Sequence, residues 1–109
     1  MNKIDIYTIS AQNVITEEDV TPMYLCKNYY SQADAEDDAR KLADSLKDDE
    51  EVVEVTVYAG EYEDADTGNI FGENFDIFTA TNTDKEKSMA ARKEANYVRL
   101  NGLDYYAGE

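Results

Sequence analysis

The sequence predicts an α+β domain in which a four-stranded antiparallel sheet carries two helices on one face, in the order ββαββα. Three observations support this prediction: strand-like alternation near the start, an alanine stripe at helical spacing, and a valine-rich hairpin followed by a second helix cap. A chain of 109 residues, 42% of them apolar, suits a single domain over residues 1–109 with one modest core. The alternative is a pair of two-stranded units that complete their sheet as a homodimer, because alanine-rich helices bury little area.

The first half of the chain, about residues 3–49, is expected to contain two strands and a helix. The segment "KIDIYTIS" alternates every two residues, which predicts a strand, and "MYLCKNYY" is predicted as a second strand after a polar connection that ends at Pro22. Ser31 has the position of a helix N-cap, with Asp34 in the first turn. The apolar stripe of this helix consists of Ala35, Ala39, Leu42, Ala43 and Leu46.

The second half, about residues 51–102, is expected to hold a hairpin and a second helix. Valines alternate with polar residues in "EVVEVTVYAGEY", and "IFGENFDIFTAT" returns after a polar loop in which Gly68 supplies a positive φ angle. Thr83 and Glu86 have the spacing of a capping box, and the pair Asn101-Gly102 is a helix stop. Residues 103–109 form a C-terminal tail.

The two halves resemble each other. The octapeptide "ARKLADSL" at residues 39–46 aligns with "ARKEANYV" at residues 91–98, and the caps Ser31 and Thr83 align at the same offset of 52 residues. Together with the preceding strands, this alignment predicts a structural pseudo-repeat of two ββα units.

Composition excludes several kinds of chemistry. There is no histidine, so Ser-His and Cys-His nucleophiles are absent, and a single cysteine allows neither an internal disulfide nor a cysteine-based zinc site. The loop "DADTGN" fails as an EF-hand, because placing Gly68 at the sixth position puts Ala65 at the third, where a ligand is needed. We therefore expect no enzyme activity, no cofactor and no metal. No segment has the apolar length of a signal peptide or a membrane span, which favours a cytoplasmic protein.

The charge is strongly acidic and unevenly distributed. The chain has 25 acidic and 10 basic side chains, a formal net charge of −15. Residues 31–66 hold fourteen acids and three bases, a net charge of −11, whereas residues 80–100 hold three acids and five bases, a net charge of +2. The first helix should therefore present a negative face and the second a neutral or basic one. Such a charge repels nucleic acid and anionic membranes, so the expected partner is a basic protein.

The candidate contact surface consists of the acids that lie on the first helix outside the centre of its stripe, in the turn after it, and around the hairpin loop. These residues are Asp34, Asp37, Asp38, Asp44, Asp48, Asp49, Glu50, Glu61, Glu63, Asp64 and Asp66. Carboxylates crowded on rigid elements can imitate a row of phosphates, and a positively charged partner would relieve their mutual repulsion.

The progression "YYSQADAEDDARKLADSL" followed by "EVVEVTVY", within residues 23–80, resembles small acidic uncharacterised proteins of bacterial phages and mobile elements. The resemblance implies a DNA mimic of the anti-restriction or anti-CRISPR type, which occupies a positively charged nucleic-acid-binding surface. The sequence thus predicts a non-enzymatic acidic protein-binding module. Two alternatives stay open: an accessory or structural domain that is acidic for solubility only, and an immunity protein against a basic toxin.

Overall fold

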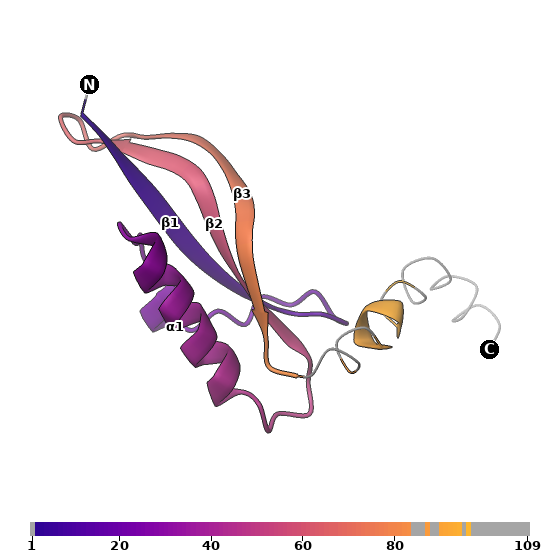
Figure 1. Ribbon diagram of the computed structural model, residues 1–109. Coiled ribbons are helices and arrows are strands. Elements are labelled where there is room, and N and C mark those ends of the chain that lie inside the picture. The colour runs from indigo at the N-terminus through magenta and orange to yellow at the C-terminus, as the bar shows by residue number, and fades with distance from the viewer. Residues whose placement is uncertain (1, 84–86, 88–89, 95, 97–109) are drawn as a thin grey trace.

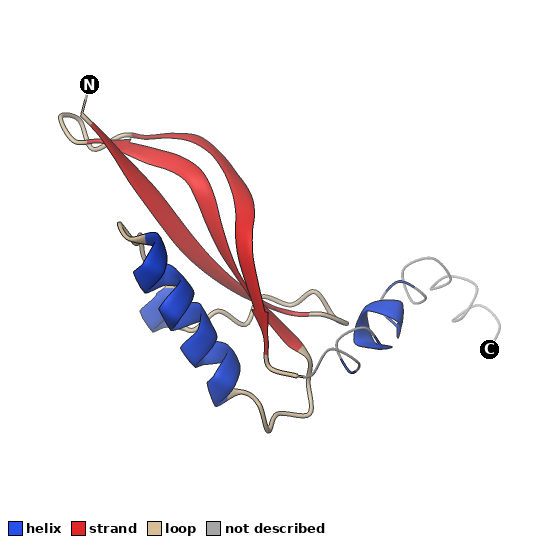
Figure 2. Ribbon diagram, in the orientation of Figure 1, coloured by secondary structure: helices blue, strands red, loops and turns tan. Residues whose placement is uncertain are grey.

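The structure is a computed structural model that describes residues 2–83, 87, 90–94 and 96. Its elements are β1 (Lys3–Asn13), the 3-10 turn η1 (Met23–Leu25), α1 (Gln32–Ser45), β2 (Val53–Asp64) and β3 (Ile70–Thr81). The strands form one antiparallel sheet in the order β1-β2-β3, and α1 packs on one face of it (Figures 1 and 2). Within the described part of the chain, no helix has the length and apolar composition that crossing a bilayer requires.

The first helix forms as its sequence predicts. The Oγ of Ser31 accepts a hydrogen bond from the backbone N–H of Asp34 at 3.3 Å, which confirms the N-cap. The buried side of α1 is the predicted stripe, in which Leu46 at the C-cap is only partly buried. This stripe packs on a cluster from the sheet that consists of Ile9, Ala11, Val53, Val55 and Val57. Alanine side chains are short, so this side of α1 permits a close approach to the sheet.

The hairpin of β2 and β3 is also confirmed. Val53, Val55 and Val57 are buried against α1, as their alternation predicts. In the connecting loop, the backbone N–H of Gly68 donates to the carbonyl of Asp64 at 2.7 Å, and Gly68 has a φ of 75°. The glycine is needed here because few L-residues adopt that conformation.

The predicted four-stranded ββαββα sheet is wrong, because residues 23–30 do not form a strand. Pro22 precedes the short turn η1, and only Tyr29 pairs with the sheet, through an isolated bridge to Tyr7 with two backbone hydrogen bonds of 2.8 Å. Two residues of this segment, Leu25 and Tyr29, are buried, whereas Met23 is exposed to solvent. In a strand Lys27 would share a face with these two residues, but Lys27 is exposed, so the segment lacks burial at every second residue.

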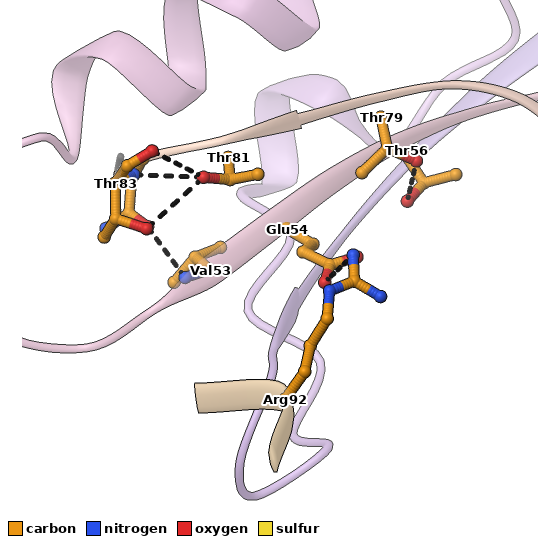
Figure 3. Close-up of polar contacts among 8 residues, drawn as sticks. Val53, Glu54, Thr56, Thr79, Thr81, Thr83 and Arg92 are labelled. Carbon is orange, nitrogen blue, oxygen red and sulfur yellow. Dashed lines mark hydrogen bonds and ion pairs between the residues drawn. The ribbon is translucent and has the colours of Figure 1, made fainter. Parts of the chain in front are cut away.

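The prediction of two helices on one face is wrong as well, and so is the ββα pseudo-repeat. The described residues 90–94 are helical, and Arg92 forms an ion pair with the carboxylate of Glu54 (Figure 3). Glu54 lies between Val53 and Val55, whose side chains face α1, so its own side chain projects from the opposite face. The capping-box residue Glu86, the predicted helix stop and the tail lie outside the described residues.

The sheet is much longer than the helix that covers it. At about 1.5 Å per residue the fourteen residues of α1 span about 20 Å, whereas at about 3.3 Å per residue the twelve residues of β2 span about 40 Å. The end of the sheet beyond α1, residues 3–6 and 59–76, is here called the distal arm (Figure 1). Residues 70–76 of β3 are all exposed, so neither face of this edge strand is covered within the described chain.

Candidate functional site

The predicted acidic residues fall into three groups on the folded chain. The helix acids are Asp34, Asp37, Asp38 and Asp44; the turn acids are Asp48, Asp49 and Glu50; the arm acids are Glu61, Glu63, Asp64 and Asp66. The turn acids precede the first residue of β2 and the arm acids surround its last, so the two groups are roughly 35 Å apart. The predicted surface is therefore an extended series and not one compact cluster.

Three of the helix acids face solvent. Asp34, Asp37 and Asp44 are exposed, because the alanine stripe directs the opposite side of α1 towards the sheet. Asp37 forms a surface ion pair with Lys41 at 3.0 Å, and such pairs contribute little to stability. Among the residues that the structure describes, neither Asp34 nor Asp44 forms an ion pair.

Asp38 has an internal partner instead. Its carboxylate accepts a hydrogen bond of 2.7 Å from the hydroxyl of Tyr29, whose ring is buried. Burial of the ring, and then the negative charge of Asp38, raise the pKa of the Tyr29 hydroxyl well above its usual value. Asp38 therefore supports the fold between α1 and the edge of β1, and it contributes less to an outward-facing surface.

The turn acids are held on a rigid support. Asp49 accepts a hydrogen bond from the backbone N–H of Glu51 at 3.0 Å, which closes the turn between α1 and β2. The buried side chain of Asn82 donates to the carbonyls of Leu46 and Glu51 at 2.9 and 2.8 Å and accepts from the N–H of Val53 at 2.8 Å. This turn is therefore fixed at both of its ends, and Asp48 and Glu50 are exposed on it.

The arm acids divide between loop and strand. Asp64 shapes the hairpin loop, because its carboxylate accepts a hydrogen bond of 3.0 Å from the N–H of Asp66. Glu61 and Glu63 are two residues apart on β2, so their side chains lie on one side of the strand, and the hydroxyl of Tyr30 donates to Glu63 at 3.4 Å. Among the described residues, no group of three or more acidic or cysteine side chains could hold a metal ion.

The distal arm also carries a set of exposed apolar side chains that the sequence pattern did not predict. They are Ile4, Ile70, Phe71 and Phe75, which are 37, 48, 42 and 57% exposed. Ile4, Glu63 and Ile70 lie opposite one another across the three strands, so apolar and acidic side chains share this face. The available clue was the strand "IFGENF", whose apolar residues follow no alternation that would bury them on one face.

A smaller exposed group lies beside α1. Met23 is 89% and Tyr24 is 67% exposed, on the turn that precedes the helix. Tyr24 belongs to the short turn that precedes α1, and Asp34 lies in the first turn of α1. Tyrosine and methionine are enriched at protein interfaces, so this end of the helix joins apolar contact area to acidic charge.

Comparison of the chain with protein-family models, with curated proteins and with solved structures finds no match.

Proposed function

We propose that this protein is a non-enzymatic acidic binding module whose α1 face contacts a positively charged surface of another protein. The observation that carries the proposal is the exposure of Asp34, Asp37 and Asp44 on a helix whose other side is packed on the sheet. Because the helix is fixed, these charges keep their spacing without a partner, and like-charge repulsion is relieved when a basic surface binds.

The length of the acidic series supports a DNA mimic as the specific form of this module. From the turn acids to the arm acids the carboxylates extend over roughly 35 Å, which is about one helical turn of DNA. A groove that binds DNA is positively charged along this length, and the helix acids lie between the two ends of the series (Figure 1). An immunity protein against a basic toxin would use the same charges, so the partner that binds distinguishes the two.

The test measures binding to purified DNA-binding proteins with positive grooves, at low and at physiological salt. The helix variant replaces Asp34, Asp37 and Asp44 with asparagine; the control variant makes the same change in charge at exposed sites elsewhere, with Asp5→Asn, Glu18→Gln and Glu94→Gln. We expect the helix variant to bind about tenfold more weakly, mainly through slower association, and the control variant to bind like the parent.

Salt and DNA provide two further readouts. Binding of the parent should weaken steeply as salt rises, since screening shortens the range of exposed charges to about 8 Å at physiological ionic strength, and double-stranded DNA should compete for the groove. Equal binding by the parent and the helix variant, or no binding by the parent to any basic protein, would leave solubility as the role of the acids.

A further inference from the structure

The two outer edges of the sheet differ in whether another segment of the described chain pairs with them. The outer edge of β1 is covered by the segment that follows it: Tyr7 exchanges two backbone hydrogen bonds with Tyr29, and Ala11 bonds to Val20 at 2.9 Å and to the hydroxyl of Thr21 at 2.8 Å. β3, by contrast, pairs only with β2 in the part of the chain that the structure describes. Every second N–H and C=O of an edge strand points outward, so residues 70–76 offer a row of backbone groups to a further strand.

Apolar side chains stand beside this open edge. Phe71 contacts the ring of Tyr62, with centroids 5.7 Å apart, and Phe75 lies over Gly60, yet both keep close to half of their surface exposed. An added strand places its side chains about 5 Å from those directly opposite. Apolar side chains on the added strand would therefore cover Phe71 and Phe75.

The negative charge of β3 indicates which kind of strand can pair with its open edge. The strand Ile70–Thr81 carries Glu73 and Asp76, both exposed, and no lysine or arginine. A second copy would bring these acids together along the edge, and each chain has a net charge of −15. Two register shifts between β2 and β3 also interrupt the edge, which disfavours pairing between identical strands. A strand with basic side chains would be attracted by Glu73 and Asp76, and it would not be repelled by the net negative charge of the chain.

We propose that residues 70–76 of β3 bind an extended, basic segment of a partner protein as a fourth strand of the sheet. Alternate apolar side chains of that segment cover Phe71 and Phe75, while its lysine or arginine side chains approach Asp76 on the other face, and Glu73 adds negative charge beside the edge. The proposal rests on the proposed function for the basic character of the partner, but it uses a surface separate from the outer face of α1. Backbone hydrogen bonds supply the affinity, and the flanking side chains supply the preference.

The experiment measures amide hydrogen exchange of the full chain with and without a synthetic peptide of alternating valine and lysine. Two matched peptides serve as controls: one replaces lysine with glutamate, and one keeps every side chain but carries N-methyl groups on alternate backbone nitrogens. We expect the lysine peptide to slow exchange of the outward amides in residues 70–76 about tenfold, and neither control peptide to do so.

Variants separate this site from the helix face. Replacing Glu73 and Asp76 with lysine should weaken binding of the lysine peptide about tenfold, since two attractive charges beside the edge become repulsive, while the helix variant should have a smaller effect. Slowing confined to α1, or equal slowing by the N-methylated peptide, would overturn strand addition and leave the proposed function intact. Outward amides that are already protected in the free chain would overturn it too, because the edge would then be occupied.

Discussion

One buried side chain, that of Asn82, joins three parts of the fold. Its amide nitrogen donates to the carbonyl of Leu46 at the end of α1 and to the carbonyl of Glu51 in the turn that follows. Its amide oxygen accepts from the N–H of Val53 at the start of β2. Asn82 is only 5% exposed, so water does not replace these bonds when they are lost. We predict that Asn82→Ala lowers the free energy of unfolding by about 2–4 kcal/mol, because buried backbone groups lose their partners. Urea denaturation measures the change.

The matched control for this substitution is Asn28→Ala, because Asn28 is exposed. Surface substitutions of this kind usually change stability by less than about 0.5 kcal/mol. Asn82→Asp provides a second comparison: a carboxylate cannot donate to the carbonyls of Leu46 and Glu51, so it should destabilise at least as much as alanine. Equal stability of all three variants and the parent would mean that the side chain does not bridge these elements in solution.

The hydroxyl of Tyr29 makes stability depend on alkaline pH. Its pKa is raised in the folded protein above the value of about 10 in an unfolded chain, by burial and then by Asp38. Up to about pH 10 the hydroxyl is protonated in both the folded and the unfolded state, so its contribution to stability is fully present. Above about pH 10 the unfolded state loses this proton while the folded state keeps it, which favours unfolding. We predict that the free energy of unfolding falls as pH rises above about 10, and that Tyr29→Phe reduces this fall.

Tyr30→Phe is the matched control, because Tyr30 is adjacent and exposed, with a longer hydrogen bond of 3.4 Å to Glu63. Denaturation of the parent and both variants at neutral and alkaline pH makes the comparison, and absorbance of tyrosinate should show Tyr29 ionising only on unfolding. If Tyr29→Phe and the parent lose stability in parallel above about pH 10, the raised pKa is not the cause.

At the scale of elements, the hairpin depends on a close approach of two glycines. Gly60 and Gly72 have φ angles of 103° and 94°, and a Cβ on Gly72 would collide with the carbonyl oxygen of Gly60. We predict that Gly72→Ala destabilises the hairpin by several kcal/mol, because it combines a steric collision with a strained backbone. Thermal unfolding compares it with Gly68→Ala, which has a similar φ but nothing within 4 Å.

Gly68→Ala should cost only about 1–2 kcal/mol, the strain of an L-residue in the left-handed region. The difference between the two variants therefore isolates the collision between β2 and β3. Similar melting temperatures for both would show that the strands separate at Gly60 and Gly72 without loss of the fold.

Local patterns explain which elements the sequence predicts correctly. The cap at Ser31, the stripe of α1 and the alternation of Val53, Val55 and Val57 each depend on neighbours within a few residues, and all are confirmed. Residues 23–30 were predicted wrongly because a strand needs a partner, and of these residues only Tyr29 pairs with the neighbouring edge of β1. Arg92 approaches the face of the sheet opposite α1, where it pairs with the carboxylate of Glu54. These two residues are far apart in the sequence, so no local pattern indicates the pair.

The candidate site was predictable in part for the same reason. The exposure of Asp34, Asp37 and Asp44 follows from helical periodicity, so the sequence indicates it directly. The separation of the turn acids from the arm acids depends on β2 being one long strand, and the open edge of β3 depends on the absence of a described fourth strand beside it. Both are properties of strand pairing across the sheet.

For the molecule as a whole, charge opposes folding. A net charge of −15 on 109 residues means that compaction brings like charges together. Raising the salt concentration from about 0.01 M to about 0.15 M shortens the screening length from about 30 Å to about 8 Å. We predict that the melting temperature rises over this range, by about 4 °C or more for each kcal/mol of repulsion removed.

The helix variant tests the cause of this rise. It carries three fewer negative charges, so it should melt higher than the parent at low salt and gain less from added salt. Circular dichroism followed with temperature measures both. A salt response that is the same in the parent and the variant would mean that the helix acids do not repel one another appreciably in the folded chain.

The pairing of β1 with β2 has a consequence for the order in which the chain folds. Lys3 lies opposite Asp64, so this pair closes a loop of about sixty residues, whereas β2 and β3 are joined by a short turn. Long loops close slowly, and the hairpin with its local contacts can form first and offer α1 a surface to dock on. During synthesis β1 leaves the ribosome before β2, and in this order of folding β1 is the last of the three strands to be paired. The residues of β1 therefore stay without their partner strand until β2 has been synthesised.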